Sequence, residues 1–149
     1  MLDPEEGIEV ASLETVAAPA NLRAILAFFA GTCAGAGIAG PVRHDLRLAV
    51  EEVCSNVIRH GYGPGRPGPI RLEVRELADR YEIAIEDRAA PFDPASAPVP
   101  DLTLDWEDRP LGGQGWHLVR NVVDELRYER LPGPGNRVTL VKRKPKNRR

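Results

Sequence analysis

The chain has 149 residues, a formal net charge of -2 at pH 7, and 42% hydrophobic and 28% charged residues. This length suits one domain with its own hydrophobic core and is too short for two. The balanced charge gives no overall attraction to nucleic acid or to an anionic membrane. We therefore expect a single globular domain over residues 1–149 that binds neither nucleic acid directly nor a membrane.

The cysteines and the two ends of the chain point to a cytoplasmic protein. Cys33 and Cys54 fall within apolar helical patterns without Cys-x-x-Cys spacing, which indicates reduced core residues. The N-terminal residues lack the basic and apolar regions of a secretory signal.

Basic residues crowd positions 143–149 without interleaved aromatic residues, which favours a solvated tail over a nucleic-acid arm.

The first half of the chain is predicted to contain one strand and two helices. Residues 7–16 form the strand, and a helical pattern then begins at Pro19 and ends among glycines 31, 35 and 37. Pro41 begins a longer helix that runs to about Gly61, where a segment rich in glycine and proline ends regular structure.

The longer helix carries a polar stripe beside an apolar row. Glu52, Asn56 and His60 are spaced four residues apart, which places them on one helical face. The adjacent apolar row, expected to pack on the core, is Leu46, Val50, Val53 and Val57. A carboxylate and an amide one turn apart can serve proton transfer and metal binding, although either could be a solvated helix residue. His60 could simply interact with the helix dipole.

Two alternating strands follow, over residues 70–74 and 81–85, joined by a turn at 77–79. Counting forward from the second strand, Asp87 falls on the core-facing side, where a carboxylate is costly without a partner. It is either a turn-forming residue just past the strand or a fixed acceptor for a ligand donor.

Residues 88–111 are rich in proline and are predicted to form a lid or binding loop. The glycines that follow, at 112, 113 and 115, precede a helical pattern at 118–123. Such a cluster can bring backbone N–H groups close to a phosphate, or it can serve only a tight turn. Two final strands are predicted, around residues 126–128 and 138–140, with a turn at 132–136.

Taken in order, these segments resemble the motifs of the GHKL ATP-binding superfamily. Residues 51–62 are similar to its N box, residues 86–94 to its first glycine box, and residues 112–119 to its second. The C-terminal matches narrow the resemblance to the bacterial anti-sigma-factor serine kinases of the RsbW and SpoIIAB type. These matches are Asp124, Glu125, Tyr128, Asn136, Arg137 and Val138 to Leu140. The resemblance spans about residues 8–142, which would form the core of the domain.

This resemblance implies an α+β two-layer sandwich of the Bergerat type, with a mixed, mainly antiparallel sheet and helices on one face. ATP would lie between the long helix and a lid formed by residues 88–111. Asn56 would coordinate Mg²⁺ against the nucleotide, and Glu52 would be the catalytic general base. Asp87 would accept a hydrogen bond from the adenine amino group, and Gly113 and Gly115 would lie along the phosphates.

The implied activity is phosphorylation of a serine or threonine on a STAS-domain anti-anti-sigma protein, together with sequestration of a sigma factor. A homodimer is a further expectation, because related kinases are commonly dimers. One position departs from the family pattern: Ala89 stands where a glycine is usual, so a partner-binding module without kinase activity is the alternative. A histidine kinase is not expected, since the roughly 18 residues before the first helix cannot form its two-helix dimerisation hairpin.

Overall fold

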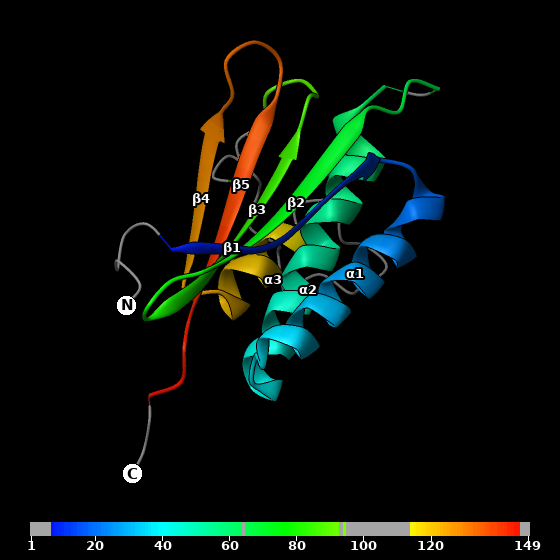
Figure 1. Ribbon diagram of the computed structural model, residues 1–149. Helices are drawn as coiled ribbons and strands as arrows, with labels where there is room; N and C mark the ends of the chain where they lie inside the picture. The colour runs from blue at the N-terminus through cyan, green and yellow to red at the C-terminus, as the bar shows by residue number, and fades with distance from the viewer. Residues whose placement is uncertain (1–6, 64, 93, 95–113, 147–149) are drawn as a thin grey trace, which may run out of the picture.

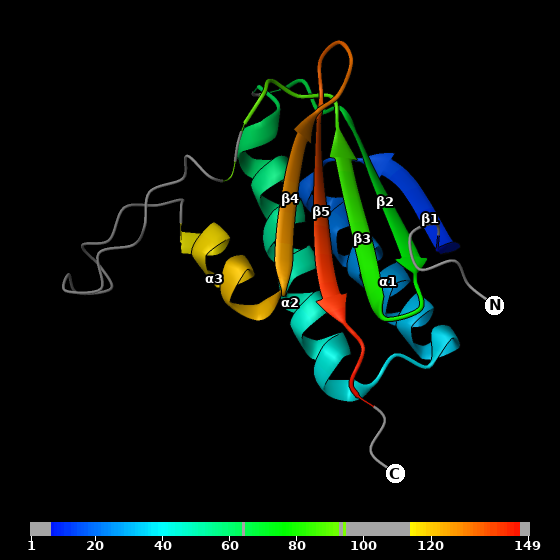
Figure 2. The ribbon, with the colours of Figure 1, turned by 90° about the vertical axis from the view of Figure 1, so that its left-hand side faces the viewer.

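The computed structural model describes residues 7–63, 65–92, 94 and 114–146. A five-stranded sheet forms one layer, and helices cover one of its faces as the second layer (Figures 1 and 2). The strands are β1 (Ile8–Val16), β2 (Pro69–Glu76), β3 (Arg80–Asp87), β4 (Glu125–Arg130) and β5 (Asn136–Arg143). The α-helices are α1 (Leu22–Ala36), α2 (Gly40–Asn56) and α3 (Gln114–Val122). The predicted two-layer α+β sandwich is confirmed.

The strand order in the sheet is β1-β2-β3-β5-β4, and each of these four pairings is antiparallel. The hairpin of β4 and β5 therefore docks beside β3, with β5 in the interior of the sheet (Figure 2). In this register Asp87, the last residue of β3, lies opposite Asn136, the first residue of β5. On its other side Asp87 lies opposite Ile70 of β2.

Helix α2 lies between α1 and α3 and packs its apolar row on the sheet (Figure 1). Leu46, Val50 and Val53 are fully buried, and Val57 is nearly so, as the apolar spacing predicts. Helix α1 ends at Gly37, whose φ of 67° is the left-handed conformation that glycine adopts readily at a helix C-terminus. No helix in the described part of the chain has both the length and the hydropathy to cross a membrane.

The two cysteines are free thiols within the helical layer. Cys33 and Cys54 are both buried, as predicted for reduced core residues. Burial raises the pKa of Cys33 to about 11, with a small opposing effect of Arg43, and burial raises the pKa of Cys54 to about 12. Both side chains are therefore uncharged thiols at neutral pH, and they contribute to packing rather than reactivity.

The basic C-terminal residues begin as part of the sheet. Arg143 is the last residue of β5, and residues 147–149 lie outside the described part of the chain. Lys142 donates from Nζ to the carbonyl oxygen of Val122 at 2.7 Å and pairs with Asp45 of α2 at 3.0 Å. Lys144 pairs with Glu76 at 2.6 Å. These two lysines hold the end of β5 in place. Of the two, only Lys144 belongs to the segment 143–149 that the sequence predicts as a solvated tail.

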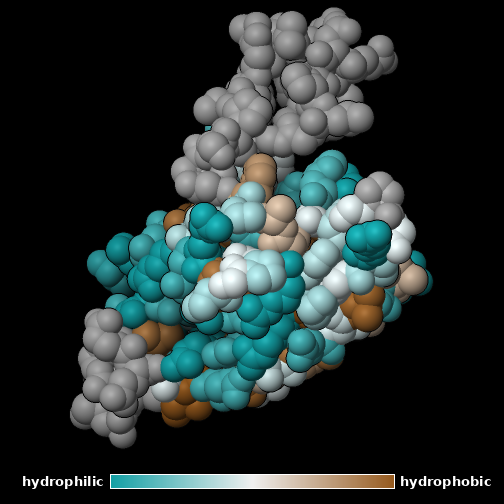
Figure 3. Space-filling view, turned by 90° about the horizontal axis from the view of Figure 1, so that it is seen from above, coloured by the Kyte–Doolittle hydropathy of each residue, from teal (hydrophilic) through white to brown (hydrophobic). Residues whose placement is uncertain are grey.

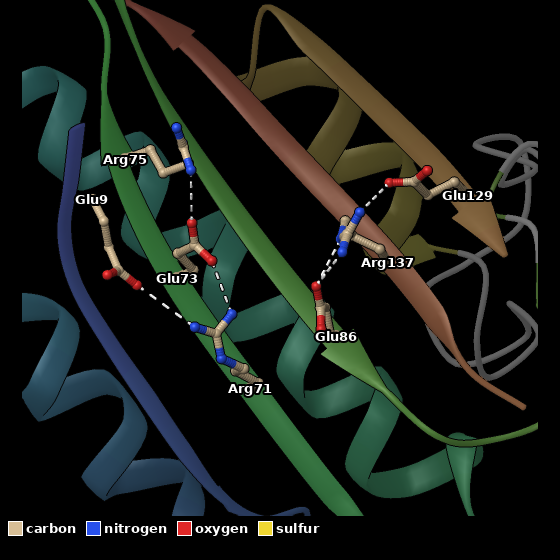
Figure 4. A network of polar contacts seen from close by, with 7 residues as sticks. All are labelled: Glu9, Arg71, Glu73, Arg75, Glu86, Glu129 and Arg137. Atoms are coloured by element: carbon tan, nitrogen blue, oxygen red, sulfur yellow. Dashed lines mark hydrogen bonds and ion pairs between the residues drawn. The ribbon is translucent and has the colours of Figure 1, made fainter. Parts of the chain in front are cut away.

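The sheet face opposite α1, α2 and α3 carries a network of ion pairs (Figure 4). Arg71 contacts Glu73 at 2.8 Å and Glu9 at 3.6 Å, and Arg75 contacts Glu73 at 3.2 Å. Partial burial of Glu73 opposes ionisation, but its hydrogen bonds from Arg71 and Arg75 outweigh that effect and hold its pKa below the usual value. The pairs of Glu73 with Arg71 and Arg75 run along β2, and the pair of Arg71 with Glu9 crosses to β1. These charged side chains cover this face of the sheet and stabilise it.

The lowered pKa of Glu73 predicts a specific pH dependence of stability. A carboxyl group with a depressed folded-state pKa stabilises the fold above its unfolded pKa and loses that contribution as the pH falls. Glu73→Gln should therefore lower the free energy of unfolding by about 1 kcal/mol at pH 7. The difference from wild type should shrink as the pH falls below about 4.5, and urea unfolding at several pH values measures it.

The control is Glu51→Gln on α2, which removes a carboxylate whose ion pair with Arg47, at 3.5 Å, lies outside this network. This variant should follow the wild-type curve within about 0.5 kcal/mol at each pH. A constant gap between Glu73→Gln and wild type from pH 7 down to pH 3 would contradict the assignment.

Candidate active site

Glu52 and Asn56 lie on the last turns of α2 and are both half-buried. The Asn56 side chain donates from Nδ2 to the carbonyl oxygen of Glu52 at 2.9 Å. This bond orients the amide and leaves Oδ1, the amide atom that can coordinate a cation, for other partners. The carboxylate of Glu52 and the amide oxygen of Asn56 therefore form an oxygen-rich surface on one side of α2.

The backbone at the start of α3 packs directly on that surface. A Cβ atom added to Gly115 would lie 2.6 Å from Oε2 of Glu52 and 3.3 Å from Nδ2 of Asn56. A residue with a side chain could not approach so closely, so glycine at this position brings main chain against both polar groups. The sequence predicted that Gly115 precedes the helix. In the structure α3 begins at Gln114, so Gly115 lies within its first turn.

The other predicted phosphate-contacting residue, Gly113, lies outside the described residues. Most of the predicted lid, residues 93 and 95–111, also lies outside them.

Asp87 is the buried carboxylate at the end of β3, with 7% of its surface exposed. It lies on the core-facing row, as the alternation predicts, and it is the last residue of the strand. Its Oδ1 accepts hydrogen bonds from the Ala89 N–H and from Nδ2 of Asn136, both at 2.9 Å. The bond from the residue two positions later also gives Asp87 the character of a turn-forming residue. Among the described residues both of these bonds are accepted by Oδ1, so Oδ2 is the atom that could accept from a ligand.

Asn136 connects Asp87 to the segment that leaves β3, and its side chain is buried, with 5% exposure. Besides Asp87, its Nδ2 donates to the carbonyl oxygen of Ala90 at 3.0 Å. Its Oδ1 accepts from the Phe92 N–H at 3.0 Å and from the Tyr128 hydroxyl at 2.5 Å. The amide thus uses its two donor hydrogens and both acceptor positions.

Sequence reasoning assigned no role to Asn136 or to Tyr128. Their importance follows from the pairing of β5 with β3 and β4, which the sequence pattern does not specify. The signals that the sequence did offer were the match of both residues to the pattern of the anti-sigma kinases and the place of Asn136 directly after a glycine-rich turn.

The first residues of the predicted lid contact α3. Phe92 stacks on Trp116, with ring centroids 5.9 Å apart and an interplanar angle of 28°. Arg120 donates from Nη2 to the carbonyl oxygen of Pro94. Trp116 is buried, whereas about half of the Phe92 surface is exposed. These contacts hold the chain that follows Asp87 close to the helix that carries Gly115.

His60 does not continue the polar stripe. The chain from Val57 to Gly61 forms a π-helical turn, here labelled η2, directly after α2. Its hydrogen bonds span five residues instead of four, which changes the direction of the side chains relative to the preceding α-helix. The stripe is therefore regular for Glu52 and Asn56 and ends there, and His60 is exposed.

The C-terminal end of α2 and the end of β3 lie at the same end of the molecule (Figure 1). Figure 3 looks onto this end, where the described surface is mainly hydrophilic. The structure thus brings an acidic and amide-bearing helix, a glycine backbone and a buried carboxylate to one side of the fold. Such a combination can accept a polar, multiply charged ligand.

Comparisons with known proteins identify the family. The histidine kinase-like ATPase domain family matches residues 15–142. The serine/threonine-protein kinase BtrW of Bordetella bronchiseptica is 33% identical over 100 residues, which are 67% of this chain and 70% of that protein. The anti-sigma F factor of Clostridium beijerinckii is 28% identical over the same shares of the two chains. The serine-protein kinase RsbW of Bacillus subtilis is 28% identical over 95 residues, which are 60% of this chain and 58% of that protein.

Solved structures agree on the fold. A Mycobacterium tuberculosis protein that contains RsbU and RsbW domains matches with a TM-score of 0.65 and 18% identity, over 93% of this chain and 34% of that chain. The histidine kinase domain of a blue-light-activated kinase from Erythrobacter litoralis matches with a TM-score of 0.50 and 21% identity, over 68% and 44% of the two chains. The chain therefore belongs to the histidine kinase-like ATPase family, in the group of serine/threonine-protein kinases and anti-sigma factors that includes BtrW and RsbW.

Proposed function

We propose that this protein is an ATP- and Mg²⁺-dependent serine/threonine protein kinase that acts as an anti-sigma factor. In this proposal it phosphorylates a STAS-domain anti-anti-sigma protein and otherwise sequesters a sigma factor. The family and the names of its relatives support the kinase and anti-sigma roles. The observation that carries the proposal is the close approach of the Gly115 main chain to Glu52 and Asn56. The buried Asp87 is the last residue of β3, whose end lies at the same end of the molecule as the C-terminal end of α2 (Figure 1).

The polar groups at the end of α2 suit Mg²⁺ and a triphosphate. Mg²⁺ prefers oxygen ligands and is commonly held by one or two protein groups together with phosphate oxygens. Asn56 would supply its Oδ1, since its Nδ2 already donates to the helix backbone. The main chain of Gly113 and Gly115 would run along the phosphates, where a glycine allows the closest approach. Bound Mg²⁺ would neutralise charge on the phosphates.

Glu52 is positioned one turn before Asn56 and would act as the general base. Phosphoryl transfer requires little covalent chemistry from the protein, so the main demands are positioning and charge neutralisation. A carboxylate beside the metal-binding amide can accept the proton of the attacking serine or threonine hydroxyl. The contact of its Oε2 with the Gly115 main chain would keep this carboxylate beside the phosphate site.

Asp87 would bind the base of ATP. Its Oδ1 is fixed by Ala89 and Asn136, so the carboxylate presents Oδ2 in a defined direction. A carboxylate accepts hydrogen bonds and selects a ligand that offers an N–H donor, such as the amino group of adenine.

The remaining parts of the proposal concern assembly and location. We infer a homodimer from the likeness to anti-sigma kinases, and a cytoplasmic site of action because sigma factors and ATP are both found there. The alternative function is a module of the same fold that binds a STAS protein or sigma factor without transferring phosphate.

Ala89 was the reason for that alternative, and its surroundings favour an intact nucleotide site. Among the described residues, no residue other than glycine has a positive φ, so Ala89 needs none of the freedom that glycine offers. Its N–H donates to Asp87, and the residue is buried. A Cβ added to Gly61 would lie 3.5 Å from the Ala89 methyl group, so this methyl group faces the end of η2.

The central experiment incubates the protein and Mg²⁺-ATP with a STAS-domain protein from the same organism and maps phosphate by mass spectrometry. We expect phosphoserine or phosphothreonine on the STAS protein, and a loss of roughly 10²–10⁴ in rate for Glu52→Gln. The matched control is Glu51→Gln, because Glu51 is the neighbouring carboxylate and pairs with Arg47 at 3.5 Å. Complex formation without phosphate transfer would favour the non-catalytic module.

Asn56 should determine the Mg²⁺ dependence of nucleotide binding. Wild type should bind ATP more tightly with Mg²⁺ than with EDTA, and Asn56→Ala should reduce this difference by about tenfold, or 1.4 kcal/mol. Calorimetric titrations with and without the metal measure the effect. Asn121→Ala, which removes an exposed amide from α3, is the control and should titrate like wild type. An unchanged metal dependence in Asn56→Ala would remove Asn56 from the metal site.

Ala89→Gly tests the departure from the family pattern. Because Ala89 already has an ordinary φ, the glycine variant should bind ATP within about twofold of wild type. It should be less stable by roughly 0.5–1 kcal/mol, since glycine increases the entropy of the unfolded chain. Calorimetry and thermal unfolding measure the two effects. A tenfold gain in ATP affinity would instead mean that the Ala89 methyl group crowds the base.

A further inference from the structure

Tyr62, the first residue after η2, joins two strand ends through its hydroxyl group. The hydroxyl oxygen accepts a hydrogen bond from the Arg88 N–H at 2.7 Å and donates to the carbonyl oxygen of Pro69 at 2.6 Å. Ile70 and Asp87 are the terminal pair of the ladder between β2 and β3. Pro69 directly precedes Ile70, and Arg88 directly follows Asp87, so both lie just beyond this pair. The hydroxyl group thus bridges the Arg88 N–H and the Pro69 carbonyl oxygen, where the next backbone hydrogen bond between these strands would otherwise form.

The ring of Tyr62 is held in place by its fit to Gly68. A Cβ atom added to Gly68 would overlap Cε1 and Cζ of the ring, so the ring occupies the space that a side chain at this position would fill. Burial raises the pKa of Tyr62, with a smaller opposing effect of its bond from the Arg88 N–H. The hydroxyl group therefore keeps its proton at neutral pH and can continue to donate to Pro69.

This contact connects the two halves of the candidate site. Asn56 is the last residue of α2, η2 continues directly from it, and Tyr62 follows η2. On the other side of the contact, Arg88 follows Asp87 directly. The bonds from Ala89 and Asn136 orient the Asp87 side chain, whereas the bond from the Arg88 N–H to Tyr62 holds the main chain directly after it. Loss of the Tyr62 hydroxyl would therefore free the main chain at the end of β3 and change the position of Asp87 relative to Asn56.

We propose that Tyr62 is a positioning residue that aligns Asp87 with the phosphate site and so determines selectivity for adenine. This inference rests on the proposed ATP-binding function. It differs from a general structural role, because a displaced Asp87 should weaken only the contact with the adenine amino group. Binding of the triphosphate and metal should persist.

The test compares ATP with ITP, in which a carbonyl group replaces the amino group that Asp87 would bind. Tyr62→Phe keeps the ring against Gly68 and removes both hydroxyl bonds. We expect ATP to bind about tenfold more weakly, a change of 1.4 kcal/mol, and ITP to bind within about twofold of wild type. The preference for ATP over ITP should fall accordingly, and in the kinase assay KM for ATP should rise while kcat changes little.

Tyr81→Phe is the matched control, because Tyr81 is a buried tyrosine at the opposite end of the strand that carries Asp87, six residue pairs away in the register with β2. It should leave the ATP-to-ITP ratio at the wild-type value. Thermal unfolding shows whether each variant is folded at the temperature of the titration.

A second pair of variants reaches the same contact without altering Tyr62. Gly68→Ala should displace the tyrosine ring and lower the ATP preference as Tyr62→Phe does. Gly63→Ala in the same connection meets no atom within 4 Å and should behave like wild type. The Tyr62→Phe and Gly68→Ala effects should not add in the double variant, because both act through one contact.

The outcomes separate this inference from the proposed function. If wild type binds neither ATP nor ITP, the proposed function fails. If wild type prefers ATP and Tyr62→Phe keeps that preference, Tyr62 has no positioning role. Equal weakening of ATP and ITP in Tyr62→Phe would also overturn the proposal, since it indicates a general effect on the fold.

Discussion

A buried carboxylate requires hydrogen-bond donors, and the way Asp87 obtains them organises one end of this fold. An unpartnered charge in the core would cost several kcal/mol, on the order of the whole stability of a small domain. Asp87 takes one donor from its own segment, Ala89, and one from a distant strand, Asn136. Because Asn136 also binds Ala90 and Phe92, the same amide determines the direction in which the chain leaves β3.

Helix α2 combines packing and polar function on adjacent faces. Its apolar row, including Leu46 and Val50, is fully buried against the rest of the core, so the helix has little freedom to rotate or slide. The packing of the apolar row therefore also fixes the position of the polar face. Glu52 and Asn56 need few additional contacts to be held in place. Because Gly115 has no side chain, the main chain at the start of α3 can lie close to both of these polar groups.

Features that depend on local periodicity were predictable from the sequence, and features that depend on distant pairing were not. The buried row of α2 and the inward position of Asp87 follow from spacings of 3.6 and 2 residues. The amide network of Asn136 requires β5 to pair with β3 in one register, which no local pattern encodes. The π-helical turn that displaces His60 and the fit of the Tyr62 ring to Gly68 also arise from tertiary packing.

The link between Asp87 and Asn136 joins residues 49 positions apart, and it has an evolutionary consequence. The chain between them includes α3, which carries Gly115, and β4, which pairs with β5. Loss of either side chain would leave the other buried polar group without this partner, which costs about 1–3 kcal/mol. The two positions should therefore change together, if at all, in related sequences.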